Sequence, residues 1–207
     1  MDNLQGENKN TQNISPEEEH FLKLIQKRWS PRSFSDEKIP IESIQQIFEA
    51  GKTIMSSFNE QPWRIIFAFK DDPHYSKLFD CLGEFNQNWV RTAPCLGVVV
   101  ARKHFTKKDK INRHRFYDSG AFMAAATLRA TSMGLFAHQM AGFTPQKVVD
   151  HFDLPDEFEP ITMFVIGKPT DPDQLPEDLR KQETKKSDRK ELDEFLYQGW
   201  EVPYRKA

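Results

Sequence analysis

The sequence is poor in cysteine, with Cys81 and Cys95 as its two thiols among 207 residues. Two isolated cysteines fit neither a disulfide framework nor a metal motif, so we expect free, buried thiols in a reducing compartment. Long apolar runs are also missing, since none reaches the roughly 18 residues that a membrane span needs. The polar start, residues 1–13, lacks the apolar core of a signal peptide. The sequence therefore predicts a cytoplasmic protein with no membrane partner.

An excess of one charge is absent as well. Lys and Arg number 29 against 31 Asp and Glu, which gives a net charge of -2. No overall field favours nucleic acid, so we predict no nucleic-acid partner. The glycine-rich signatures GxGxxG and GxxxxGK[ST] do not occur, so dinucleotide-fold and P-loop assignments lack their sequence anchors. The histidines show no ligand spacing such as HExxH, and we predict no metal site.

What is present is aromatic and apolar. Hydrophobic residues make up 38% of the chain, with 17 Phe and 4 Trp. A chain of this length buries roughly 70% of its unfolded surface, so its core needs no disulfides or structural metals for stability. We predict a disordered tail at residues 1–14, one domain at residues 15–200 and a C-terminal tail at residues 201–207.

Helices and strands alternate without a strict βαβ rhythm, which favours an α+β fold. We expect helices at residues 15–28, 40–52, 75–82, 118–133 and 144–154, with a further helical stretch reaching about residue 89. Strands are expected at residues 64–69, 95–101 and 161–167, with an edge strand at 195–197. The polar, basic residues 103–115 are expected to form a mobile excursion, and the charged residues 175–189 are expected to wind over the surface.

The expected helix at residues 118–133 is apolar around most of its circumference. Its alanines, together with Phe122, Met123 and Leu128, leave little polar surface. Such a helix is buried inside its own domain or against a second subunit.

Arg28, Ser30 and Arg32 lie two residues apart, where Pro31 enforces extended backbone. Alternate residues of an extended segment point to one side, so these three side chains converge. Two guanidinium groups and a hydroxyl suit a phosphate monoester, a dianion with several acceptor oxygens. The alternative is an ordinary basic turn after a helix, with cations near the helix C-terminus.

The stretch Ser56-Ser57-Phe58-Asn59-Glu60-Gln61-Pro62-Trp63-Arg64 is the most informative in the chain. It crowds two hydroxyls, two carboxamides and an arginine into one loop. Asn59 and Gln61 each carry donors and acceptors, as the edge of a flat heterocyclic ligand requires. The alternative, a capped loop with Trp63 in the core, accounts for the tryptophan but not for the density of amides.

A third segment runs from Gly134 to Phe143. Gly142 allows the backbone to approach a ligand closely, and backbone N–H groups there suit a flat ring. The alternative is a strand end and a turn before the helix at Thr144.

These three segments, in this order, resemble the FMN-dependent nitroreductase family from about Phe21 to Trp200. The resemblance implies a three-layer α/β/α fold with a mixed, mostly antiparallel central sheet. It also implies an interlocked homodimer with two FMN at the interface, and NAD(P)H as the reducing co-substrate.

The resemblance further implies which residues contact FMN. Arg28, Ser30 and Arg32 would hold the phosphate and the flavin edge from one subunit, and Ser56, Ser57 and Asn59 would come from the other. Asn86, seven residues before Ala93, resembles the family's asparagine near the flavin pyrimidine. A C-terminal basic residue usually completes the phosphate site; Arg189 fits best, with Lys186 as the alternative. The full set of predicted cofactor-binding residues is Arg28, Trp29, Ser30, Arg32, Ser56, Ser57, Asn59, Gln61, Asn86, Ala141, Gly142 and Arg189.

One departure concerns Ala141, where many members of the family carry an acidic residue. The backbone serves the cofactor there, so the change bears on the charge of the substrate pocket rather than on the fold.

By the same resemblance the chain is an oxidoreductase that reduces nitroaromatic or quinone acceptors in two hydride-transfer steps at one flavin. No catalytic side chain is assigned, because the flavin carries the chemistry. The alternatives are a reductase of another acceptor, such as an enone or a pteridine, a flavin carrier or sensor with little turnover, and a flavin-free interaction module.

Overall fold

The structure is a computed structural model that describes residues 14–108, 110–184 and 187–203. Its centre is a four-stranded sheet with the order β1-β2-β4-β3. The strands are β1 (Trp63–Phe69), β2 (Cys95–Arg102), β3 (Phe136–Met140) and β4 (Phe158–Gly167). All three pairings between them are antiparallel. The three strands expected from apolar runs are confirmed, and β3 adds a fourth at the sheet edge.

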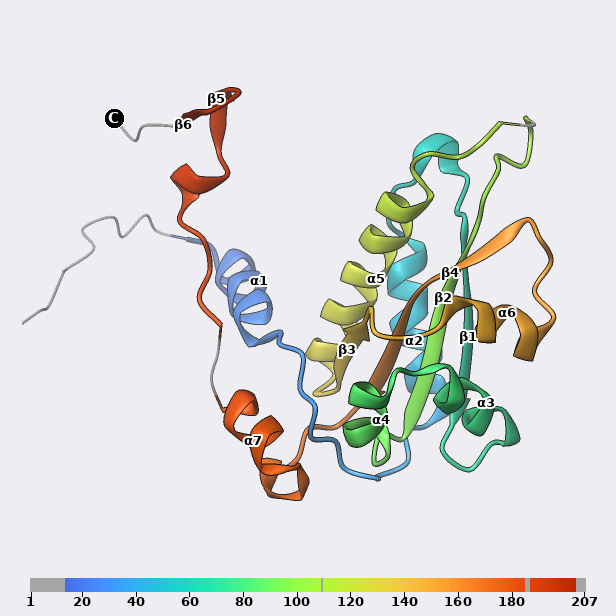
Figure 1. The fold of residues 1–207 in the computed structure, drawn as a ribbon. Helices are drawn as coiled ribbons and strands as arrows, with labels where there is room; N and C mark the ends of the chain where they lie inside the picture. The colour runs from blue at the N-terminus through green and yellow to red at the C-terminus, as the bar shows by residue number, and fades with distance from the viewer. Residues whose placement is uncertain (1–13, 109, 185–186, 204–207) are drawn as a thin grey trace, which may run out of the picture.

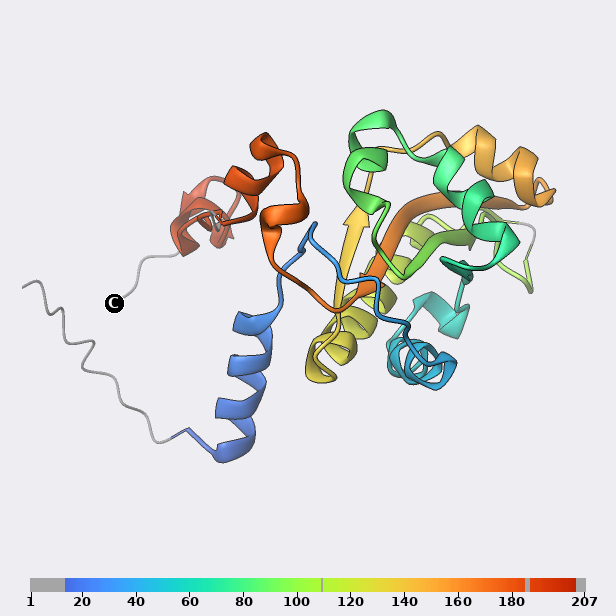
Figure 2. The same cartoon turned by 90° about the horizontal axis from the view of Figure 1, so that it is seen from below.

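Helices cover both faces of this sheet (Figures 1 and 2). One face carries α2 (Ile41–Lys52) and α5 (Arg115–Ser132); the other carries α3 (Pro73–Cys81), α4 (Glu84–Val90) and α6 (Pro145–Phe152). Strand β2 shows why two cores form. Leu96 and Val98 face one core while Cys95 and Val99 face the other, because side chains alternate along a strand. The predicted α+β, three-layer α/β/α architecture is confirmed.

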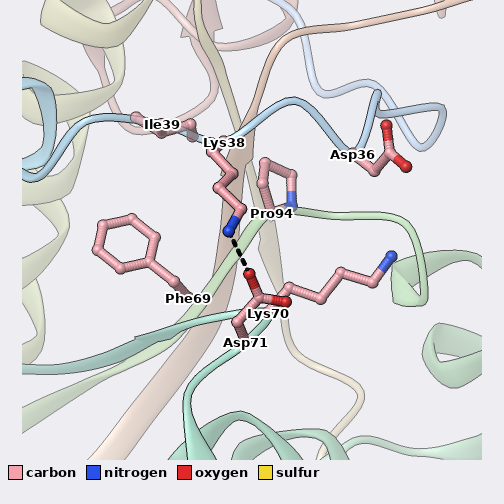
Figure 3. A pocket seen from close by; sticks show the side chains of 7 residues that line it. All are labelled: Asp36, Lys38, Ile39, Phe69, Lys70, Asp71 and Pro94. Atoms are coloured by element: carbon pink, nitrogen blue, oxygen red, sulfur yellow. Dashed lines mark ion pairs between the residues drawn. The ribbon is translucent and has the colours of Figure 1, made fainter.

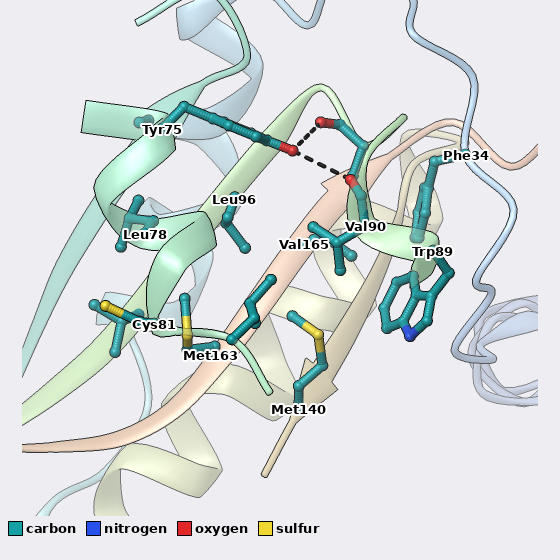
Figure 4. Packing of buried hydrophobic residues seen from close by; sticks show 14 of the residues in the cluster. Phe34, Tyr75, Leu78, Cys81, Trp89, Val90, Leu96, Met140, Met163 and Val165 are labelled. Atoms are coloured by element: carbon teal, nitrogen blue, oxygen red, sulfur yellow. Dashed lines mark hydrogen bonds between the residues drawn. The ribbon is translucent and has the colours of Figure 1, made fainter. Parts of the chain in front are cut away.

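The core beneath α3 and α4 is built around aromatic side chains (Figure 4). The Tyr75 hydroxyl donates to the carbonyl oxygens of Val90 at 3.2 Å and Ala93 at 2.8 Å, which ties α3 to the end of α4. The rings of Phe34 and Trp89 stack with their centroids 6.4 Å apart. These contacts fix α4 and the segment after α1 (Pro16–Lys27) against the same sheet face.

Both thiols are free and buried, as predicted. Burial raises the pKa of the Cys81 thiol to about 11 and that of the Cys95 thiol to about 12. Because the thiolate is the reactive form, these cysteines are packing residues and not nucleophiles.

The opposite core is organised by Phe122 of α5. Its ring stacks on Trp63 at 4.8 Å and on Phe48 of α2 at 6.0 Å. Trp63 is buried at the first position of β1, so it belongs to the core, as the alternative interpretation of its loop required. It anchors the end of the polar loop to the sheet.

Helix α1 begins where the sequence predicts, with the Ser15 hydroxyl accepting a hydrogen bond from the Glu18 N–H at 3.2 Å. The helix has no buried residue and extends away from the three-layer body in both views (Figures 1 and 2). Its apolar residues Phe21, Leu22 and Ile25 are exposed. Among the described residues, none covers the exposed apolar face of this amphipathic helix.

The expectation that residues 175–189 only cover the surface is wrong. Helix α7 (Glu177–Glu183) forms there, and Leu175 and Leu179 are buried in the core. The sequence obscured this because charged residues outnumber the two leucines, although their spacing of four marks one helical face.

The predicted edge strand near residues 195–197 is also wrong in its pairing. Strand β5 (Tyr197–Gly199) pairs with β6 (Val202–Pro203) in a separate hairpin rather than with the central sheet. Three short 3-10 helices complete the elements: η1 (Ser57–Asn59), η2 (Pro172–Gln174) and η3 (Leu192–Glu194).

The tail predicted at residues 1–14 lies almost entirely outside the described residues, as does the greater part of the tail predicted at 201–207. Among the helices that the structure does describe, none combines the length and apolar character required to cross a membrane.

Candidate functional site

The first predicted motif follows α1 and is fixed against the edge strand β3. The Pro31 carbonyl oxygen accepts a hydrogen bond from Nδ1 of His138 at 2.8 Å. The ring of Trp29 lies edge-on to that of Phe136, with centroids 6.4 Å apart. Further along, the Ser35 N–H donates to the Lys168 carbonyl at 2.9 Å. The extended segment around Pro31 therefore lies beside the ends of β3 and β4.

This segment forms one wall of a cavity of about 580 Å³. The cavity brings together five predicted cofactor ligands from two distant parts of the chain: Arg28, Trp29, Ser30, Arg32 and Arg189. Among the described residues its charged lining consists of three arginines and one glutamate, which together carry two net positive charges that suit a dianion. The other basic candidate, Lys186, lies outside the described residues.

The glutamate of this cavity, Glu183 at the end of α7, is a residue that the sequence did not reveal. Its Oε1 accepts hydrogen bonds from the backbone N–H of Arg32 at 2.7 Å and of Ser33 at 3.2 Å. Only 4% of its side chain is exposed. Glu183 therefore clamps the segment that carries Arg32 and Ser33 to a helix about 150 residues later.

The Arg32 guanidinium is incompletely satisfied. Its Nη1 lies 3.9 Å from Oε2 of Glu183, and its buried Nε has no hydrogen-bond partner within the described part of the chain. A buried donor without a partner costs roughly 1–3 kcal/mol. An anionic oxygen in the cavity removes that cost, so these residues fit a phosphate group.

His138 is packed into the same wall, with its ring 4.6 Å from that of Trp89. Burial lowers its pKa, and the hydrogen bond to Pro31 opposes that shift only in part. The neutral ring donates through Nδ1, because a carbonyl oxygen can only accept. The histidine thus acts as a structural support for the motif.

We expect a pH-dependent loss of stability from His138. The pKa of His138 is lower in the folded state than in the unfolded chain. The unfolded chain therefore binds more protons as the pH drops below about 6.5, and the free energy of unfolding decreases as the pH is lowered. In His138→Gln this part of the pH dependence disappears. Urea titrations between about pH 5 and 7 measure the difference; equal slopes in both proteins contradict the assignment.

The second predicted motif forms η1 and the residues after it. Phe58, Asn59 and Gln61 have φ values of 54°, 55° and 48°, which side chains other than glycine rarely adopt. The Ser57 N–H donates to Oδ2 of the buried Asp118 at 3.1 Å, and the Gln61 N–H donates to the Ser56 hydroxyl at 3.0 Å. Strained backbone that hydrogen bonds hold in place is typical of ligand-binding loops.

This loop does not line the arginine cavity of its own chain. Ser57 instead borders a second cavity, beside the start of α5. The assignment of Ser56, Ser57, Asn59 and Gln61 to a flavin held by the other subunit therefore stays a prediction.

The third motif ends at Gly142, after β3. The Asn86 side chain donates from Nδ2 to the Gly142 carbonyl at 2.8 Å, and its Oδ1 accepts from Trp89 Nε1 at 3.2 Å. A Cβ at position 142 would lie 2.8 Å from Asn86 Nδ2, so glycine is required by this close approach. Ala141 and Gly142 are exposed and present their backbone to solvent.

These contacts refine the role predicted for Asn86. Both ends of its amide are hydrogen-bonded inside the protein, and the bond from Nδ2 holds the Gly142 carbonyl in place. A direct contact of Asn86 with the flavin stays a prediction.

Another cavity, of about 450 Å³, lies at the far end of β1 and is lined by Asp36, Lys38, Ile39, Phe69, Lys70, Asp71 and Pro94 (Figure 3). Lys38 and Asp71 form an ion pair of 2.6 Å there, but both side chains are largely exposed. No predicted site residue borders this cavity, and an exposed ion pair contributes little free energy. Within residues 14–203, gaps excepted, no cluster of three or more His, Cys, Asp or Glu could hold a metal.

Comparisons with known proteins agree with this architecture. A crystal structure of an oxidoreductase containing FMN superposes with a TM-score of 0.81 at 32% identity, over 85% of this chain and 90% of that one. A nitroreductase family protein of Clostridium difficile 630 shares the fold, with a TM-score of 0.67 and 24% identity over 86% of this chain and 97% of its own.

Among curated proteins, an FMN reductase [NAD(P)H] of Bacillus subtilis (strain 168) is 27% identical over 167 residues. The match spans 72% of this chain and 66% of that relative. The model of the Nitroreductase family matches residues 25–168, well over half of the chain. This chain therefore belongs to the nitroreductase family.

Proposed function

We propose that the chain is an NAD(P)H-dependent flavin oxidoreductase that binds FMN through the arginine cavity. The observation that carries the proposal is the convergence of Arg28, Ser30, Arg32 and Arg189 on one cavity, with an unpartnered Arg32 Nε. Two similar proteins, an oxidoreductase containing FMN and an FMN reductase, support the same cofactor. The acceptors we propose are nitroaromatics and quinones.

Each segment of the site has a separate task in this proposal. The three guanidinium groups and the Ser30 hydroxyl bind the phosphate, and Glu183 holds the segment that carries Arg32. The exposed backbone at Ala141 and Gly142 faces the isoalloxazine ring, in a position maintained by Asn86. When bound, FMN supplies the hydride-transfer chemistry, so the protein needs no nucleophile or general base of its own.

We further propose that the active unit is a homodimer. The η1 loop does not line the arginine cavity of its own chain, which suits a contribution to the flavin of a second copy. The described residues leave two apolar surfaces incompletely covered: the exposed face of α1, and a stripe on α5 with Ala124 exposed and Ala121 and Leu128 half-buried. A second copy is the simplest cover for both.

We expect steady-state turnover with a quinone or a nitroaromatic acceptor to give parallel double-reciprocal lines at several NAD(P)H concentrations. The reason is that both substrates use one flavin face in turn. Replacing any one of the six histidines should leave the rate within about tenfold, or roughly 1.4 kcal/mol of barrier. Intersecting lines contradict the shared site, and a far larger loss with flavin retained reveals a missed acid-base residue.

The colour of the purified protein tests the proposal directly. A yellow protein with about one FMN per chain, bleached by NAD(P)H without oxygen, is the expected result. A colourless protein would indicate a flavin-free interaction module. A yellow protein that NAD(P)H does not bleach would indicate a carrier or sensor. A panel that includes enones and pteridines then separates the acceptors.

A further inference from the structure

A cavity of about 620 Å³ separates the η1 loop from the polar segment that follows β2. Aromatic rings and cations line it together: Phe58, Phe105, Tyr117, Lys110, Arg113 and His114. None of these residues borders the arginine cavity. Binding of the FMN phosphate therefore does not account for this second cavity.

The walls of this cavity are anchored. Oε1 of Glu60, in the strained loop, accepts a hydrogen bond from the Thr106 N–H at 2.7 Å. Across the base of the excursion, the Asn112 N–H donates to the Lys103 carbonyl at 2.8 Å and the Phe105 N–H to the Lys110 carbonyl at 3.0 Å. The segment is folded back on itself, so its side chains hold a defined arrangement around the cavity.

Phe58 points out of the protein. Its side chain is 84% exposed on backbone with a φ of 54°. Its ring meets that of Phe105 edge-on at 5.7 Å, and Lys108 Nζ lies 5.5 Å from its centroid. Holding a large ring in water on strained backbone costs free energy, which stacking against a ligand ring would offset.

The charge of this segment is strongly positive. Residues 103–115 contain six Lys and Arg and one acidic residue, Asp109. Arg115 pairs with Glu159, whereas Lys110 and Arg113 are exposed and have no ion-pair partner among the described residues. Among the described residues, which do not include Asp109, no aspartate or glutamate lines the cavity. In nucleotide sites an acidic residue recognises the ribose 2′-hydroxyl of NAD, and a basic one accommodates the 2′-phosphate of NADP.

We propose that this cavity binds the adenosine 2′-phosphate half of NADPH, with Lys110 and Arg113 on the phosphate and the aromatic rings on the adenine. The enzyme then prefers NADPH to NADH. The proposal rests on the proposed function, since it identifies the reductant of the same flavin. It assigns a task to the basic segment that FMN binding leaves unexplained.

The test compares kcat/KM for NADPH and for NADH in the holoenzyme, with a quinone at saturation. The wild type is expected to favour NADPH by about tenfold or more, as charge-assisted hydrogen bonds to a phosphate imply. In the double variant Lys110→Gln/Arg113→Gln this ratio falls by roughly the same factor. The matched control is Lys107→Gln, a neighbouring exposed lysine outside the cavity, which keeps the ratio.

A binding measurement separates this proposal from the proposed function. By calorimetry, adenosine 2′,5′-bisphosphate should bind the wild type about tenfold more tightly than 5′-AMP, and the double variant should lose that difference. A wild type with no preference between the two nucleotides, or an unchanged ratio in the double variant, overturns the proposal. Selective binding without flavin reduction by either coenzyme supports this site while it refutes the proposed function.

Discussion

Replacing Arg28 by glutamate should give a protein that folds but purifies without colour. Arg28 lines the arginine cavity at the end of α1, and among the described residues its guanidinium makes one long hydrogen bond, 3.4 Å from Nη1 to the Ser30 hydroxyl. Removing one partner of a buried charge pair costs roughly 2–5 kcal/mol, and the new carboxylate adds repulsion with the phosphate. The FMN content per chain, read from the visible absorbance, measures the effect.

The adjacent residue provides a matched control. Lys27→Glu makes the same change of charge one position earlier, at an exposed residue that does not line the cavity. It should retain flavin, and circular dichroism should show both variants folded. Stoichiometric FMN in Arg28→Glu would refute the phosphate assignment. Arg32 is less suitable for this test because Glu183 links its backbone to α7.

Local chemistry explains why much of the fold was predictable. Ser15 and Pro16 begin α1 where expected, since a hydroxyl cap and a proline at the first position are determined by neighbours in sequence. The apolar run of β2 predicted a strand buried on both faces. The cavity ligands Arg28, Ser30 and Arg32 were predictable because Pro31 fixes their common direction.

The rest depends on contacts between distant parts of the chain. Glu183 meets the backbone of Arg32 across 151 residues, and Asp118 meets Ser57 across 61. Nothing near either carboxylate in the sequence marks it as buried. The hydrogen bond of Asn86 to Gly142 likewise joins residues 56 positions apart, which no local sequence pattern indicates. Sequence patterns identify which residue types could bind a ligand, whereas topology determines which ones hold the binding segments in place.

For the alanine-rich helix α5, too, the sequence predicts an apolar surface, whereas the fold determines which part of that surface is buried. Phe122, Met123 and Ala126 are buried against the sheet, so part of its apolar surface is explained within one chain. Gly120 and Ala124 remain exposed, with Ala121, Ala125 and Leu128 half-buried beside them. The sequence predicts that this helix is buried inside its own domain or against a second subunit. The exposed and half-buried stripe is the part of the helix that a second subunit could cover.

We expect sedimentation of the wild type at micromolar concentration to give a homodimer that carries FMN. Ala124→Arg should instead give a colourless monomer, because a guanidinium in the apolar stripe must be desolvated without a partner at a cost of several kcal/mol. Flavin and dimer should be lost together, since the η1 loop of each copy is proposed to complete the site of the other.

The control for that experiment places the same side chain on the opposite layer. Ser76→Arg alters an exposed position of α3 and should remain a yellow dimer. A wild-type monomer with flavin bound would contradict both the dimer and the shared site. A monomeric Ala124→Arg that still holds FMN would separate them: the stripe would mediate assembly, while the arginine cavity, with Glu183 and Gly142, would suffice to bind the cofactor within one chain.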